Sequence, residues 1–258
     1  MASILTNLFD GVAYGMLLFV LACGLAVTLG LMNFVNLAHG AFAMAGGYIC
    51  AVLVNNSGWP FFAALPLAFV GSALIGIALE RTLYRHLYSR SHLDQVLFSI
   101  GLVFMSVAAV DYIMGSSRVF IKLPAALEGQ IDLFGVGIGR YRLMIVVICG
   151  LLTLALQLIL AKTRFGSRLR AAVDDPRAAI GLGINVPQVF AFTFAFGCGL
   201  AGLGGALSAE ILGLDPYFPL KFMIYFLIVV TVGGSSSITG PFLASLLLGI
   251  DRKSTRLN

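Results

Sequence analysis

The stretch that decides the fold is residues 11–79, GVAYGMLLFVLACGLAVTLGLMNFVNLAHGAFAMAGGYICAVLVNNSGWPFFAALPLAFVGSALIGIAL, in which 69 consecutive residues include no Lys, Arg, Asp or Glu. A helix that crosses a bilayer needs about 20 predominantly apolar residues, so this stretch is long enough for about three such helices. A soluble helical bundle keeps charged residues on the faces that meet water. The stretch therefore predicts membrane-spanning helices.

The composition of the whole chain supports the same class. Of the 258 residues, 60% are hydrophobic and only 10% are charged, and the mean hydropathy is +1.01. Soluble domains carry roughly a quarter charged residues. A water-soluble globule this apolar would expose large apolar patches and aggregate. We therefore expect an all-α integral membrane protein without a soluble domain of its own.

Charges, prolines and glycines divide the chain into about eight transmembrane or partly spanning helices. We expect them at residues 9–31, 36–54, 61–79, 96–114, 143–161, 189–212, 222–233 and 240–250, which together form one polytopic membrane domain over residues 1–250. The last has 11 residues, too few to cross a bilayer, and the basic segment 251–258 follows it. We interpret residues 251–258 as a non-native tail and the C-terminus as truncated.

The loop charges predict the orientation in the membrane. Residues 80–95 contain three Lys or Arg and residues 162–188 contain five. Because two predicted spans separate these loops, both lie on one face, and the positive-inside rule makes that face cytoplasmic. Counting back places the N-terminus outside. The opposite face holds five basic residues, Arg118, Lys122, Arg140, Arg142 and Lys221.

Three polar residues interrupt the apolar sequence where the second predicted span begins. Asn33, Asn36 and His39 are spaced roughly as on one helix face. Polar side chains in a membrane are costly unless they are paired, so they favour a bundle interior or a translocation path. They could equally satisfy backbone groups where the helix is interrupted. The spacing leaves both interpretations open.

The sixth predicted span carries small residues at four-residue intervals, Gly197, Ala201 and Gly205. This spacing is typical of a face that packs closely on another helix. Residues 197–202 also match GxGxxG, but a dinucleotide site needs a preceding strand, which an apolar helix does not supply. No P-loop motif occurs, and the four cysteines lie singly in apolar segments. We expect no cofactor and no metal site.

The loop of residues 162–188 contains a helix-start signal. Two aspartates precede Pro176, an arrangement that favours a helix beginning at the proline, here over residues 176–182. A short amphipathic helix flanked by Arg168 and Arg170 suits docking onto another protein. The loop could equally be a solvated segment that only sets the orientation.

Three blocks of sequence resemble the branched-chain amino acid type permeases of ABC transporters. They are NLAHGAF at residues 36–42 with GGY at 46–48, RAAVDDPRAA at 170–179 with GIN at 183–185, and LAGLGGAL at 200–207 with GGSSSITGP at 233–241. Their order and spacing cover most of residues 1–250. The resemblance implies a helical permease domain that performs no covalent chemistry itself.

The resemblance also assigns roles to residues. It implies that an ATPase docks on a coupling loop that includes Arg168, Arg170, Ala171, Asp174, Asp175, Ala178 and Gly183. It implies a translocation path beside Asn33, Asn36, His39 and Gly40. The implied function is the permease subunit of an ABC importer for a small polar solute, most typically a branched-chain amino acid. ATP would be hydrolysed by a separate subunit, so this chain would not be an enzyme.

The resemblance implies several partners and a location. The partners are a second permease subunit in a homodimer or heterodimer, cytoplasmic ATP-binding subunits, an extracytoplasmic solute-binding protein and the lipid bilayer. The location is the bacterial or archaeal plasma (inner) membrane. No nucleic-acid partner is expected, because the basic residues lie in short loops between apolar runs.

Other transport classes stay open from the residues alone. An ion-coupled secondary transporter would need a mid-span carboxylate or paired broken helices. Asp111 and Glu210 lie near the ends of predicted spans, where water can reach them. An ABC permease for urea or a sugar is a further alternative, since no residue pattern selects the solute.

Overall fold

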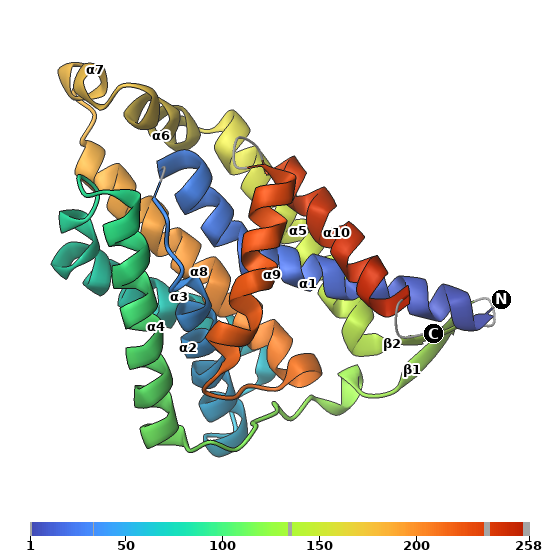
Figure 1. The fold of residues 1–258 in the computed structure, drawn as a ribbon. Coiled ribbons are helices and arrows are strands. Elements are labelled where there is room, and N and C mark those ends of the chain that lie inside the picture. The colour runs from blue at the N-terminus through green and yellow to red at the C-terminus, as the bar shows by residue number, and fades with distance from the viewer. Residues whose placement is uncertain (1, 33, 134–135, 235–237, 255–258) are drawn as a thin grey trace.

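The computed structural model describes residues 2–32, 34–133, 136–234 and 238–254 (Figure 1). The described chain is almost entirely helical. Its α-helices are α1 (Ala2–Met32), α2 (His39–Ala51), α3 (Phe61–Thr82), α4 (His92–Met114), α5 (Arg140–Lys162), α6 (Arg164–Asp174), α7 (Pro176–Gly181), α8 (Val186–Leu212), α9 (Phe218–Gly233) and α10 (Thr239–Ser254). The all-α class expected from the composition is confirmed.

Short elements connect these helices. A π-helical turn, Val52–Asn56, continues α2, and 3₁₀ turns form at Tyr84–His86 and Ala125–Leu127. One antiparallel hairpin pairs β1 (Gln130–Leu133) with β2 (Val136–Gly139), with Ile131 opposite Ile138. The hairpin lies within the long break between the fourth and fifth predicted spans, and the sequence analysis did not predict it.

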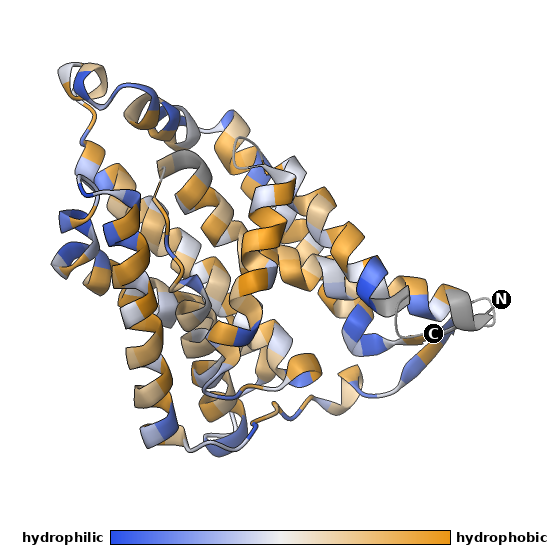
Figure 2. Ribbon diagram, in the orientation of Figure 1, coloured by the Kyte–Doolittle hydropathy of each residue, from blue (hydrophilic) through white to orange (hydrophobic). Residues whose placement is uncertain are grey.

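Five described helices are long and apolar enough to cross a membrane. They are the segment Leu5–Leu29 of α1 and the helices α3, α4, α5 and α8. The apolar parts of α1 and α8 are 83% and 67% buried within the protein, against 28%, 17% and 22% for α3, α4 and α5. Helices α1 and α8 are therefore central, and the other three present apolar faces outward, as a bilayer requires (Figure 2).

Glycines allow the central helices to approach closely. A Cβ added to Gly46 of α2 would lie 2.2 Å from the Gly202 Cα of α8, and one added to Gly24 of α1 would lie 2.3 Å from the Gly197 carbonyl oxygen. Of the predicted packing residues, Gly197 faces Gly24, Ala201 is fully buried, and Gly205 lies against α2. Because no side chain separates the backbones, the helices approach as small-residue motifs permit.

Several boundaries differ from the predicted spans: α1 begins at Ala2 rather than at residue 9, and α9 begins at Phe218 rather than at residue 222. Helix α2 begins at His39 rather than at residue 36, because residues 34–38 form a non-helical entry segment. The last helix continues through residues 251–254 of the predicted tail, and residues 255–258 lie outside the described part of the chain. Although α10 is short, it packs along α1, where Gly11 and Gly15 meet its backbone.

Candidate translocation path and coupling surface

The entry segment, residues 34–38, crosses the interior of the bundle without forming a helix. Two of its backbone N–H groups are satisfied by side chains of α4: Val35 donates to Gln95 Oε1 at 3.1 Å and Leu37 donates to Ser99 Oγ at 3.2 Å. Irregular backbone at membrane depth is stable only when buried in protein or lining a water-filled cavity. Helix α4 supplies that cover with one buried stripe and leaves its other faces exposed.

Asn36 lies at the centre of this entry segment and is fully buried. Its Oδ1 accepts hydrogen bonds from the Ala38 N–H at 3.1 Å and from the Tyr84 hydroxyl at 3.0 Å. Its Nδ2 has no hydrogen-bond partner among the described residues. Asn36 therefore organises the start of α2 and retains one buried donor, so the structure supports the structural interpretation without removing the functional one.

His39 and Gly40 lie on the other side of the start of α2. The buried His39 Nε2 is 3.0 Å from the Leu21 carbonyl oxygen of α1, and the imidazole ring meets Phe226 of α9 edge-on. A Cβ on Gly40 would lie 2.9 Å from the Pro219 Cα of α9. These residues therefore connect α2 to α1 and α9, whereas Asn36 bonds Tyr84. Asn33 lies outside the described residues.

The sequence analysis missed the polar residues that surround the entry segment. Gln95 and Ser99 are one helical turn apart on α4, and this spacing of polar residues in an apolar span was the available signal. In the same part of the chain, Glu80 of α3 is only 3% exposed and accepts a hydrogen bond from the Tyr88 hydroxyl at 3.2 Å. Burial raises the pKa of Tyr88, so this hydroxyl is a donor at neutral pH.

Helices α6 and α7 lie in the loop that the sequence analysis predicts to be the coupling loop, and they project from the bundle at the end marked α7 in Figure 1. We call them the coupling surface. The Thr163 hydroxyl caps α6 by accepting from the Gly166 N–H at 3.3 Å. Asp175 Oδ1 caps α7 by accepting from the N–H groups of Arg177 and Ala178 at 2.9 and 3.0 Å. The helix start predicted from two aspartates before a proline is present.

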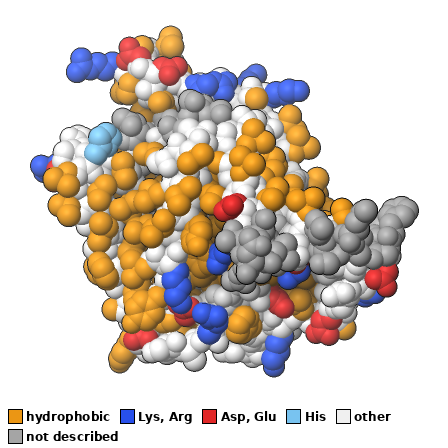
Figure 3. Space-filling model, turned by 45° about the vertical axis from the view of Figure 1, so that its right-hand side comes forward, with side chains coloured by type: hydrophobic (Ala, Val, Ile, Leu, Met, Phe, Trp, Pro, Cys, Tyr) orange, Lys and Arg blue, Asp and Glu red, His pale blue; other side chains and the backbone are white. Residues whose placement is uncertain are grey.

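The coupling residues named in the sequence analysis lie on this surface but differ in their surroundings. Arg168, Asp174, Asp175, Ala178 and Gly183 are exposed, and Ala171 is half-buried. The exposed Arg170 instead donates from Nη1 to the Leu160 carbonyl oxygen at 2.5 Å, which ties α6 to the end of α5. Basic side chains gather along this end of the molecule (Figure 3).

Two apolar side chains are strongly exposed at the tip of the coupling surface. Ile180 and Leu182 are 60% and 80% exposed, although the surrounding loop is polar. Gly183, with φ of +79°, turns the chain there toward α8, and Asn185 caps α8 by accepting from the Gln188 N–H at 3.1 Å. The caps at both ends hold the tip in a defined position relative to α8.

The described residues contain no cluster suited to a metal ion, since no three His, Cys, Asp or Glu side chains gather there.

Comparison with known proteins identifies the family. The model of the branched-chain amino acid transport system permease components matches residues 7–256. The chain belongs to this family.

Named relatives agree with the family match. This permease is 29% identical over 263 residues to the high-affinity branched-chain amino acid transport system permease protein LivH of Escherichia coli K12, covering 95% of this chain and 84% of LivH. It is 30% identical over 251 residues to the probable LivH of Methanocaldococcus jannaschii, covering 93% and 77%. It is 28% identical over 258 residues to BraD of Pseudomonas aeruginosa, covering 95% and 84%.

No solved structure matches the permease significantly. The family match and the apolar helices together establish a multi-pass protein of the plasma membrane that serves as a transport component. The three sequence blocks occupy distinct parts of the permease. The first covers the end of the entry segment and the buried start of α2, the second covers the C-terminal half of α6 and most of α7, and the third begins in the buried middle of α8.

Proposed function

We propose that this permease forms one half of the translocation path of an ABC importer for branched-chain amino acids. The observation that carries the proposal is the family match over residues 7–256, together with relatives named for branched-chain amino acid transport. A second permease subunit completes the path, ATP is hydrolysed by separate subunits, and an extracytoplasmic binding protein delivers the solute.

The coupling surface is where the ATP-binding subunit docks. An apolar tip on a polar loop favours burial against another protein, because the exposed Ile180 and Leu182 side chains leave water there. Movement of the docked subunit reaches the bundle by two routes. Arg170 connects α6 to α5, and the Asn185 cap connects the tip to the central helix α8.

The entry segment lies beside the path. Its polar groups are held by α4, a helix with one buried stripe, so that a shift of α4 would change the surroundings of Asn36. The unpartnered Asn36 Nδ2 is a donor that a second conformation or a hydrated solute can satisfy. In this arrangement the coupling surface is cytoplasmic and the N-terminus lies outside, as the loop charges predict.

Reconstituted transport tests the proposal. The permease, its partner permease and the ATP-binding subunits are placed in liposomes with the solute-binding protein outside, and uptake of labelled leucine, isoleucine and valine is measured. Uptake should require internal ATP and be blocked by a hydrolysis-deficient ATP-binding subunit. Uptake driven by a proton or sodium gradient without ATP would contradict it, and preferential uptake of urea or a sugar would contradict the solute assignment.

A further inference from the structure

A mixed polar and apolar cavity lies at the end of the bundle opposite the coupling surface. It has a volume of about 610 Å³ and lies between the C-terminal end of α8 and the N-terminal half of α9. Its charged lining comprises Asp215 and four cations, Arg118, Arg142, Lys221 and Arg252, and its apolar lining includes Phe222 and Tyr225, with the Arg252 guanidinium 5.2 Å from the Tyr225 ring centroid. We call Arg118, Asp215, Lys221, Phe222 and Tyr225 the outer pocket.

Long-range backbone pairing assembles the charged side of the outer pocket. Val119 and Leu214 exchange two backbone hydrogen bonds of 2.8 Å, which brings the loop after α4 beside the loop before α9. Gly213, which precedes Leu214, has φ of +68°, and a Cβ there would lie 2.5 Å from the Arg118 Cδ. The Arg118 side chain therefore packs directly on the Gly213 backbone, close to Asp215.

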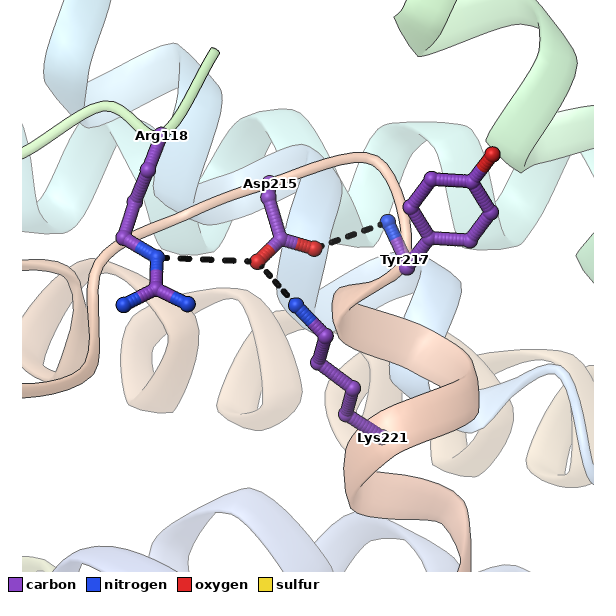
Figure 4. A network of polar contacts seen from close by, with 4 residues as sticks. All are labelled: Arg118, Asp215, Tyr217 and Lys221. Atoms are coloured by element: carbon purple, nitrogen blue, oxygen red, sulfur yellow. Dashed lines mark hydrogen bonds and ion pairs between the residues drawn. The ribbon is translucent and has the colours of Figure 1, made fainter. Parts of the chain in front are cut away.

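Asp215 is held in place by the start of α9. Its Oδ1 accepts from the Tyr217 N–H at 3.0 Å, and its backbone carbonyl accepts from the Phe218 N–H at 3.0 Å. Its Oδ2 is 2.5 Å from Lys221 Nζ and 3.8 Å from Arg118 Nε (Figure 4). Two cations therefore share a single carboxylate oxygen, and the pocket carries an excess positive charge.

The cations are accessible, whereas the carboxylate is recessed. The side chains of Arg118 and Lys221 are 55% and 49% exposed, against 11% for Asp215. The terminal nitrogens of Arg118 make no hydrogen bond or ion pair in the part of the chain that the structure describes (Figure 4). A guanidinium with free terminal donors is suited to bidentate binding of a carboxylate.

We propose that the outer pocket binds a zwitterionic α-amino acid with an apolar side chain as it enters the permease. The solute carboxylate binds Arg118 and Lys221, its ammonium group approaches Asp215, and its side chain packs on Phe222 and Tyr225. Small-molecule sites have volumes of about 300–1,000 Å³ and combine apolar walls with a few placed polar groups. This inference rests on the proposed function, since it gives the permease itself a contact with the solute.

The charge pattern selects a zwitterion over other solutes. A carboxylate without an ammonium group would bind the cations but offer no partner to Asp215, and an amine without a carboxylate would meet the excess positive charge of the pocket. An amino acid offers a partner to both signs. The ion pairs that it must loosen are half-exposed on the cationic side, where such pairs are weak.

Saturation-transfer NMR tests the binding. The complete permease complex in nanodiscs, without solute-binding protein or ATP, is mixed with leucine, leucinol or 4-methylpentanoate; leucinol lacks the carboxylate and 4-methylpentanoate lacks the ammonium group. Leucine should show the strongest transfer. Arg118→Gln and Lys221→Gln should each weaken leucine binding by about tenfold, the effect of about 1.4 kcal/mol for a lost charge-assisted contact. Lys122→Gln, an exposed lysine outside the pocket, should leave it unchanged.

Asp215→Asn gives a result that misfolding cannot imitate. The asparagine keeps an oxygen for the Tyr217 N–H but removes the charge. This variant should bind leucine more weakly than the wild type and 4-methylpentanoate more strongly, which reverses the preference. A parallel loss of both ligands, or leucine binding equal in wild type, Arg118→Gln and Lys221→Gln, overturns the proposal.

Two further measurements distinguish this proposal from a protein-docking surface and from a failure of the proposed function. If the variants lose binding of the solute-binding protein while leucine transfer is absent or unchanged, the cations form a protein-docking surface and the proposal is overturned. ATP-dependent leucine uptake by the wild type is measured in the same preparation. Uptake without pocket-dependent leucine binding overturns this inference alone, whereas absence of branched-chain uptake contradicts the proposed function.

Discussion

Gly205 is a position where a single added methyl group should be very costly. A Cβ there would lie 1.8 Å from the Ala43 carbonyl oxygen and 2.6 Å from its carbon, so the obstacle is the backbone of α2. Reaching an ordinary contact of 3.4 Å requires α2 and α8 to separate by about 1.6 Å. No rotamer change can provide this, because alanine has no rotamers and the contacted atoms belong to a helix.

The size of the effect follows from the cost of overpacking, about 1–3 kcal/mol for an inserted methylene and more when backbone must move. We expect Gly205→Ala to reach or exceed the upper part of that range. A change of 1 kcal/mol shifts the midpoint of thermal unfolding by about 2–4 °C in a protein of this size. The expected fall is therefore about 6–12 °C.

The measurement is thermal unfolding in detergent. Its readout is the fraction of protein that remains monodisperse on size-exclusion chromatography after heating. Gly150→Ala and Gly101→Ala are matched controls, because a Cβ at either of these helical glycines meets nothing within 4 Å. Each control should be stabilised by about 0.5–1 kcal/mol, since alanine loses less backbone entropy. If Gly205→Ala unfolds at the same temperature as the controls, the close approach of α2 and α8 is refuted.

Three further predictions concern the coupling surface and the Tyr88 hydroxyl. Asp175→Ala removes the α7 cap, should destabilise that helix by about 1 kcal/mol and should reduce co-purification of the ATP-binding subunit, whereas Asp175→Asn, which keeps an oxygen for the cap, should reduce it less. Leu182→Asp should abolish that co-purification, and Leu93→Asp, at another strongly exposed leucine in α4, should preserve it; equal losses would argue against docking at the tip. Burial raises the pKa of Tyr88 above its ordinary 10.0. The contribution of this tyrosine to the free energy of unfolding should therefore be constant below pH 10 and fall at higher pH. Tyr88→Phe should flatten that fall when unfolding is measured from pH 8 to 11.

The coupling surface and the outer pocket differ in how much of each could be predicted. The α7 start follows from adjacent residues, because an aspartate side chain reaches the N–H groups two and three positions on. The outer pocket joins Arg118 to Asp215 across nearly a hundred residues, through backbone pairing of two loops. No local pattern carries that information, so the sequence analysis did not single out Asp215.

The sequence by itself determined the membrane class, the positions of most helices and the family resemblance. These follow from composition, from the length of apolar runs and from short motifs, all of which are local. Only the tertiary structure decided the environment of the polar residues. Asn36 bonds Tyr84, and its neighbours Val35 and Leu37 bond Gln95 and Ser99, about sixty residues away. A buried polar group must find its partner wherever the packed helices bring one, and the chain order of the residues does not specify that place.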